Sequence, residues 1–183
     1  MRYFELTQDR QLRNLIAIDG FQNCPDIVMD RARADSFKRC TNMYVKGDEK
    51  SQYPDLFKSP VLMISEKLYQ ILKYYDTSVI YKIVVLTDLE HRRQEIYRLM
   101  MPVVIDMKNT GVEELRRQLR GGRRIFYLRG CPNGAGYTAE QNHHLIVTEE
   151  VAESILSLGS IGICYEETTP EKWASGKGED ADG

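Results

Sequence analysis

The sequence predicts an α+β protein in which a mixed or antiparallel sheet packs against a few helices. Two stretches carry this prediction: residues 57–86, FKSPVLMISEKLYQILKYYDTSVIYKIVVL, and residues 145–167, LIVTEEVAESILSLGSIGICYEE. Each contains a short apolar run, a capped segment of helical period and a second apolar run. Both therefore predict a strand, a helix and another strand, which suggests two related halves.

In the first stretch, Ser65 is a good N-cap, and Glu66 lies where the positive end of the helix dipole favours an acid. An apolar stripe follows at helical spacing, formed by Leu68, Ile71 and Leu72. In the second stretch Thr148 takes the place of Ser65. Its stripe is formed by Val151, Ile155 and Leu158. The match can also arise by chance, because any capped amphipathic helix between strands looks similar.

The rest of the chain predicts further strands and one more long helix. Strands are predicted at residues 2–6, 41–46, 94–106 with a break at Pro102, and 125–128. Thr110 and Glu113 have the spacing of a capping box, which predicts a helix over residues 112–120. Residues 12–16 fit either a helical turn or an extended segment, and a short helix is expected at 26–34.

The length of 183 residues, 42% of them hydrophobic, is enough to bury a core without disulfides or metal. We assign residues 1–169 to a single α+β domain, with possible halves 1–90 and 91–169. Residues 170–183 are poor in hydrophobic residues and predict a flexible tail. Trp173 is the one potential anchor of this tail, either docked or mobile.

Several features indicate a cytoplasmic protein without a membrane partner. No apolar run approaches the about 20 residues that span a bilayer, and the N-terminal residues lack the apolar core of a signal peptide. The four cysteines are scattered and fit reduced thiols. The sequence leaves the oligomeric state open.

Charge is distributed unevenly along the chain. Residues 91–129 contain ten Arg or Lys against four acids, whereas residues 140–169 contain six Glu and no Arg or Lys. The two segments either complement each other within the fold or present opposite charges to partners. The simplest alternative is that they are solvated surfaces that differ in charge without a function.

The chain shows no catalytic motif, so we predict neither an enzyme nor a cofactor or metal site. The rings of the adjacent His143 and His144 point to opposite sides of an extended segment, which suits one metal ion poorly. An enzyme of unfamiliar type remains as a minor hypothesis. It would use Cys131 as a nucleophile with one of these histidines as the base.

The strongest electrostatic feature is the basic segment 116–129. Its arginines could contact phosphates while Phe126 and Tyr127 stack on bases, which makes a nucleic-acid-binding or regulatory module the alternative function. The arginines concerned are Arg116, Arg117, Arg120, Arg123 and Arg124. The helix dipole alone also favours arginines at a helix C-terminus, and the overall composition is far less basic than that of a nucleic-acid-binding domain.

Three segments resemble a family of immunity proteins from bacterial polymorphic toxin systems, first catalogued as a domain of unknown function. They are RYFEL near the N-terminus, FKSPVLMISEKLYQIL in the middle and HHLIVTEEVAESILSLGSIGICYEE near the C-terminus. The last has the form of an apolar strand, a Ser or Thr with Glu, a helix and Gly-x-x-Tyr/Phe. The resemblance implies a bacterial cytoplasmic protein that binds and neutralises a cognate toxin by occlusion, and it implies no catalytic residues.

An acidic contact surface would suit a toxin with a basic surface, such as a nuclease. The candidate contact residues are Glu149, Glu150, Glu153, Glu166 and Glu167. For each glutamate taken singly, a solvated surface position is the alternative interpretation.

Overall fold

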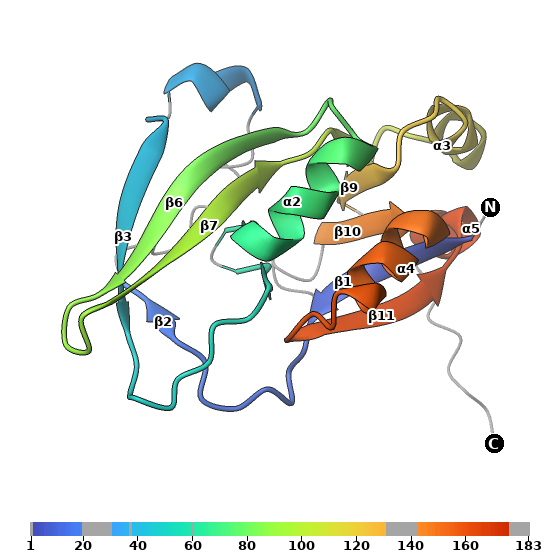
Figure 1. Ribbon diagram of the computed structural model, residues 1–183. Coiled ribbons are helices and arrows are strands. Elements are labelled where there is room, and N and C mark those ends of the chain that lie inside the picture. Colours follow the sequence, from blue (N-terminus) through green and yellow to red (C-terminus); the bar gives the residue numbers. More distant parts are fainter. Residues whose placement is uncertain (1, 20–30, 37, 60, 131–142, 176–183) are drawn as a thin grey trace.

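The computed structural model (Figure 1) describes residues 2–19, 31–36, 38–59, 61–130 and 143–175. Its strands form one five-stranded and one six-stranded sheet, and helices pack on the faces of both. Parallel and antiparallel pairs occur in each sheet. The predicted α+β class with mixed sheets and a few packed helices is therefore confirmed. The loop around Cys131 and most of the helix expected at 26–34 lie outside the described residues.

The five-stranded sheet has the strand order β11-β1-β10-β9-β8. Its strands are β1 (Tyr3–Gln8), β8 (Val104–Asp106), β9 (Ile125–Arg129), β10 (His143–Thr148) and β11 (Ile163–Thr168). β1 lies between β10 and β11 and runs antiparallel to both. A strand from the beginning of the chain thus joins two strands from its end.

The six-stranded sheet has the order β2-β3-β6-β7-β5-β4. Its strands are β2 (Ala17–Ile18), β3 (Cys40–Lys46), β4 (Leu56–Phe57), β5 (Met63–Ser65), β6 (Ile80–Asp88) and β7 (Arg93–Met101). The break predicted at Pro102 separates β7 from β8, and it also takes the chain from one sheet to the other. A proline suits this position because it cannot donate a hydrogen bond to a ladder.

The two predicted strand–helix–strand units share one topology. Helix α2 (Glu66–Tyr75) joins β5 to β6, and helix α4 (Glu149–Ser157) joins β10 to β11. In both units the two strands are parallel, and an antiparallel strand is inserted between them, β7 in the first and β1 in the second. Because β1 completes the C-terminal unit and β7 the N-terminal one, the sheets do not divide the chain into halves 1–90 and 91–169.

The largest core cluster lies where both sheets meet α2 and α4. It combines Leu6, Leu145 and Val147 of one sheet with Ile64 and Met100 of the other, and all are buried. The two helices lie side by side (Figure 1), and the Tyr75 hydroxyl lies 2.5 Å from Ser154 Oγ. The two units therefore share this core cluster.

Two smaller clusters cover the outer faces of the sheets. The 3₁₀-helix η1 (Arg31–Ser36) contributes Ala34 to the cluster on the six-stranded sheet. Helices α3 (Val112–Leu119) and α5 (Pro170–Ser175) cover the five-stranded sheet through side chains that include Leu115 and Trp173. Within the described ranges, no helix is long and apolar enough to cross a membrane.

The predicted helix caps are confirmed only in part. Ser65 Oγ accepts a hydrogen bond from the Leu68 amide at 3.2 Å, as predicted. Thr148 occupies the N-cap position of α4 but forms no side-chain cap hydrogen bond. The capping box predicted for α3 is wrong, because Gly111 is the N-cap and the Thr110 hydroxyl donates to the Asp106 carbonyl at 2.7 Å.

The tail prediction is wrong for residues 170–175, which form α5. Trp173 is docked: its side chain is only 4% exposed, and its Nε1 donates to Thr168 Oγ1 at 2.6 Å. The indole also packs edge-on against Tyr3, with ring centroids 5.7 Å apart. Of the two alternatives for residues 12–16, the structure shows the extended one, in which Leu15 forms an isolated bridge with Gln52.

The buried residue Asp55 joins the two units directly. Its carboxylate accepts a hydrogen bond from Ser65 Oγ at 2.5 Å and one from the Ile161 amide at 2.7 Å. Its backbone N–H donates to the Ile161 carbonyl, and its carbonyl accepts from the Ser65 amide, both at 2.9 Å. Four hydrogen bonds at one residue therefore fix the start of α2 against the turn that leads into β11.

Replacing this carboxylate should destabilise the whole domain. In Asp55→Asn one of the two acceptor oxygens becomes an amide donor, so either Ser65 Oγ or the Ile161 amide loses its partner. We expect the free energy of unfolding to fall by about 1–3 kcal/mol in urea titrations. Asp35→Asn, at an exposed position of η1, is the control. Equal stability of the two variants would contradict the role of Asp55.

Candidate functional site

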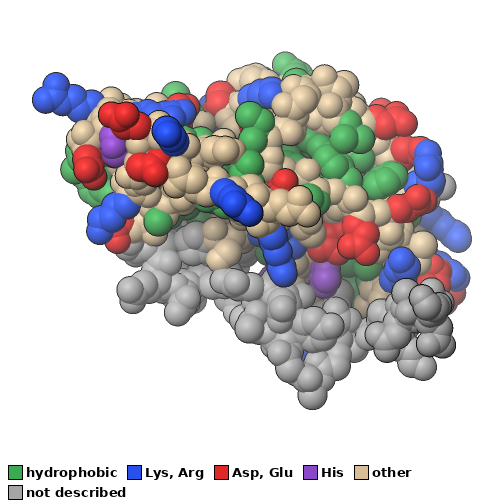
Figure 2. All heavy atoms as spheres, turned by 90° about the horizontal axis from the view of Figure 1, so that it is seen from below, with side chains coloured by type: hydrophobic (Ala, Val, Ile, Leu, Met, Phe, Trp, Pro, Cys, Tyr) green, Lys and Arg blue, Asp and Glu red, His purple; other side chains and the backbone are tan. Residues whose placement is uncertain are grey.

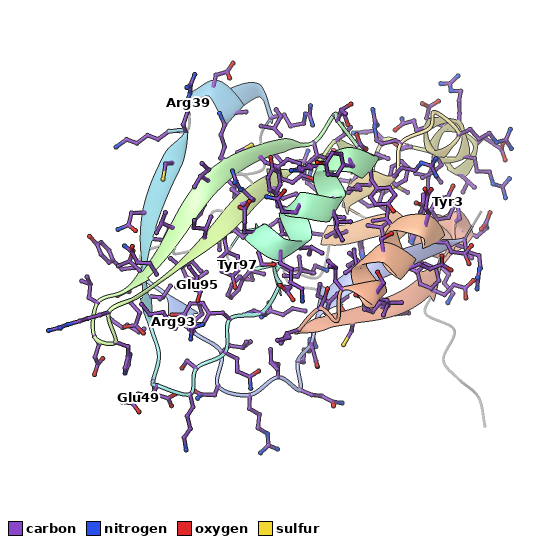
Figure 3. The ribbon with its side chains drawn as sticks, in the orientation of Figure 1. Tyr3, Arg39, Glu49, Arg93, Glu95 and Tyr97 are labelled. Atoms are coloured by element: carbon purple, nitrogen blue, oxygen red, sulfur yellow. The ribbon has the colours of Figure 1, made fainter. Side chains whose placement is uncertain are left out.

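A pocket of about 540 Å³ lies where α3, α5 and β1 meet. Figure 3 labels Tyr3 on this side of the molecule, away from Arg39, Glu49 and Arg93. The pocket is lined by Tyr3, Arg116, Leu119, Arg120, Gly122, Arg123, Arg124, Pro170 and Glu171. The structure thus brings four of the five arginines predicted as phosphate contacts to one cavity.

The end of α3 explains why these arginines converge. Arg116 and Arg120 are four residues apart and lie on the same side of the helix. Gly122 has φ +79°, a left-handed conformation that favours glycine and turns the chain back towards β9. Arg123 and Arg124 follow this turn and line the pocket beside the helix end.

Arg117 does not line the pocket. It pairs with Glu114, one turn back on α3, and its side chain is 78% exposed. The predicted set of five arginines therefore separates into four that line the pocket and one that lies on the outer surface of the helix.

Two of the pocket arginines are paired with acids. Arg116 donates to Glu113 Oε1 at 2.8 Å and to Glu171 Oε1 at 2.5 Å, and Arg124 donates to Glu150 Oε2 at 2.6 Å. In the part of the chain that the structure describes, Arg120 and Arg123 form no ion pair. The pocket consequently keeps two guanidinium groups that no carboxylate neutralises.

Phe126 and Tyr127 lack the exposure that the base-stacking hypothesis requires, in agreement with their expected place on a core strand. Both side chains are buried, with exposed fractions of 0% and 4%, and they belong to core clusters on opposite faces of β9. Neither ring is presented to solvent, so neither offers a platform for a base.

The five predicted contact glutamates are divided between two surfaces. Glu166 and Glu167 are consecutive in β11 and point to opposite faces of the sheet. Glu166 lies opposite Glu5, whereas Glu167 lies opposite Phe4, on the face where α4 packs. Glu166 therefore does not belong to the same surface as the glutamates of α4.

The outer side of α4 combines acidic and apolar side chains. Glu149, Glu153 and Leu156 follow one another at helical spacing, and Leu156 is 56% exposed. Ile161, in the turn after the helix, is 53% exposed. We call Glu149, Glu150, Glu153, Leu156 and Ile161 the α4 surface. In Figure 2 hydrophobic side chains gather with acidic ones around them on the half where α4 and β11 lie.

The α4 surface is partly neutralised from within the molecule. Glu149 pairs with Arg2, and Glu150 pairs with Arg124. Among the described residues, the basic segment 91–129 and the acidic segment 140–169 are joined by the ion pair of Arg124 and Glu150. Glu153, which is exposed, is the glutamate of α4 on which an acidic contact would depend most.

Sequence reasoning missed an ionic cluster at the junction of the two sheets. Glu5 Oε1 accepts a hydrogen bond from His144 Nδ1 at 2.9 Å and one from Lys58 Nζ at 3.4 Å. Burial raises the pKa of Glu5, but the hydrogen bond and charge of His144 and the charge of Lys58 outweigh it, so the pKa lies below its ordinary value. These residues are far apart in sequence, and no spacing pattern indicates them.

The histidine pair has the predicted geometry. His143 packs against the Tyr127 ring, with centroids 5.5 Å apart, while His144 contacts Glu5 on the opposite face. Among the residues that the structure describes, no group of three or more His, Cys, Asp or Glu is placed to hold a metal ion. Cys131, the thiol of the enzyme hypothesis, is outside those residues.

No protein-family model matches the chain, and no curated protein matches it in sequence.

The contact between Arg116 and Glu171 should appear in the titration of Glu171. The hydrogen bond from Arg116 lowers the pKa of Glu171 below its ordinary value of 4.5. The stabilisation it brings is present above that value and is lost as pH falls through the folded-state pKa. Carboxyl NMR titration of Arg116→Gln should show the pKa of Glu171 rising towards 4.5. Arg117→Gln is the matched control, and equal pKa values in both variants would disprove the contact.

Proposed function

We propose that this protein is an immunity protein that binds a cognate bacterial toxin domain and neutralises it by occlusion. The α4 surface is the contact surface of this proposal. The observation that supports it best is the exposure of Leu156 one turn after Glu153 on the outer side of α4, with Ile161 also exposed in the turn that follows the helix. The resemblance of three sequence segments to immunity proteins supports the same class.

The composition of the α4 surface suits a protein partner. Protein interfaces combine an apolar centre, which supplies most of the affinity, with a polar rim that steers association and selects the partner. Leu156 and Ile161 provide apolar groups that are more than half exposed, and Glu153 provides an exposed carboxylate that forms no ion pair with the described residues. A toxin domain with a basic, partly apolar surface would complement this arrangement.

The framework beneath the α4 surface is rigid. Val151, Ala152 and Ile155 anchor the inner side of α4 in the main core, and Asp55 holds the backbone at Ile161. Binding to such a surface orders few additional groups, and a small entropic cost favours tight binding.

The alternative, a nucleic-acid-binding or regulatory module, receives less support from the geometry. Arg116, Arg117 and Arg124 are already paired with glutamates, and Phe126 and Tyr127 are buried. A protein that tracks a nucleic-acid backbone needs several unpaired cations in a row. The unpaired Arg120 and Arg123 form a local site instead.

The first experiment is affinity capture of the tagged protein from a lysate of its bacterial host, with bound proteins identified by mass spectrometry. We expect one stoichiometric partner with a toxin-like C-terminal domain, and co-expression should protect cells from that domain. Recovery of nucleic acid alone, or of no protein at moderate salt, would contradict the proposal.

Two substitutions then test the contact surface against the captured toxin. Leu156→Asp and Glu153→Lys should each weaken binding about tenfold or more, because a central interface residue contributes roughly 2 kcal/mol. Leu89→Asp and Glu90→Lys, at exposed positions of the β6–β7 turn on the opposite side of the molecule (Figure 1), are the matched controls. Unchanged affinity in both α4 variants would rule out this surface while leaving the immunity function to be tested elsewhere.

A further inference from the structure

The pocket between α3, α5 and β1 carries more positive charge than its acids neutralise. Four arginines and one glutamate line it. Glu171 and Glu113 pair with Arg116, and Glu150 reaches Arg124, which leaves Arg120 and Arg123 without an ion pair among the described residues. A cavity with this surplus favours an anionic ligand.

The pocket's cations are all guanidinium groups, and this limits the kinds of anionic ligand that suit it. A guanidinium remains charged throughout the physiological pH range and offers donors in a planar fork that fits phosphate oxygens in pairs. The carbonyls of Arg116 and Gln118, at the end of α3, accept hydrogen bonds from the backbone of Arg120 and Gly121. The end of α3 still carries partial negative charge, and the arginines gathered there offset it.

The rest of the lining suits a ring or another flat group. Tyr3, Leu119 and Pro170 contribute apolar walls. Tyr3 is held in place by edge-on contacts with Phe126 and Trp173, at centroid distances of 6.3 and 5.7 Å. The volume of about 540 Å³ falls within the range of small-molecule sites. The pocket thus combines a cationic side with a preformed apolar side.

We propose that this pocket binds a small phosphate ester with a planar ring, of the nucleoside phosphate class. Arg120 and Arg123 hold the phosphate groups, and the ring lies against Tyr3 and Leu119. The proposal does not depend on the immunity function, since the α4 surface lies outside the pocket.

Glu171 acts as an internal competitor for the ligand. Its carboxylate already occupies Arg116 at 2.5 Å from inside the pocket lining. A bound phosphate meets this negative charge, so removing it strengthens binding. Because α5 is anchored through Trp173, and not through Glu171 alone, Glu171→Gln keeps the pocket wall in place.

Isothermal titration calorimetry of the full chain at low salt, with ATP and with pyrophosphate, tests the proposal. We expect ATP to bind more tightly than pyrophosphate, because only ATP contacts the apolar walls. Arg120→Ala and Arg123→Ala should each weaken ATP binding about tenfold or more, as expected for a lost charged hydrogen bond. Glu171→Gln should strengthen it severalfold.

Arg117→Ala is the matched control, because Arg117 carries the same charge on the same helix but lies outside the pocket. Its affinity for ATP should equal that of the wild type. An equal loss in Arg117→Ala and Arg120→Ala would reveal non-specific charge attraction and overturn the proposal. Failure of both probes to bind would overturn it too, as would an oligonucleotide whose binding neither ATP nor pyrophosphate displaces.

Discussion

The buried carboxylate of Asp55 is the constraint on which the relative placement of the two structural units depends. A buried carboxylate is tolerated only when its acceptor sites are filled, so its donors must come from fixed positions. Here one donor is the cap residue of α2 and the other is the amide of Ile161, just before β11. The start of α2 is thereby fixed relative to the turn that precedes β11.

The same constraint helps to position both candidate sites. α4 enters the main core beside α2, and the turn that follows α4 is held at Asp55. β11 leaves this turn and leads to α5, whose Pro170 and Glu171 line the pocket between α3, α5 and β1. The α4 surface and the pocket are further connected by the pair of Arg124 and Glu150, although such an exposed pair contributes at most about 1 kcal/mol.

The sequence was informative about the helices and strands whose formation depends on one short segment. Runs of β-branched residues predicted β6, and Ser65 predicted the start of α2, because local periodicity and a capping hydroxyl act over a few residues. Pro102 correctly marked a break, but its consequence was not visible, since the sheet that each side joins depends on distant partners. Thr110 misled because the helix begins one residue later, with Gly111 as its N-cap, and the Thr110 hydroxyl donates to the Asp106 carbonyl instead.

The candidate sites were less predictable, because they combine segments that are distant along the chain. The arginines were identified, but the pocket also needs Tyr3 from β1 and Glu171 from α5. The one signal for the part played by α5 was Trp173. A large apolar side chain in an otherwise polar segment indicates that the segment docks on the domain through it. The acidic set was too broad for a similar reason, because β alternation sends Glu166 away from α4.

The position of β1 has a consequence for biosynthesis. The strands of the six-stranded sheet, β2 to β7, are continuous in the chain, so this sheet can assemble while later residues are still being translated. β1 must wait, because its contacts span long separations, such as the 139 residues between Glu5 and His144. During that interval β1 has neither of its neighbours, β10 and β11, and a strand with unpaired edges is prone to wrong pairing. The C-terminal unit can therefore assemble only after β11 has been translated, and until then β1 remains exposed to wrong pairing.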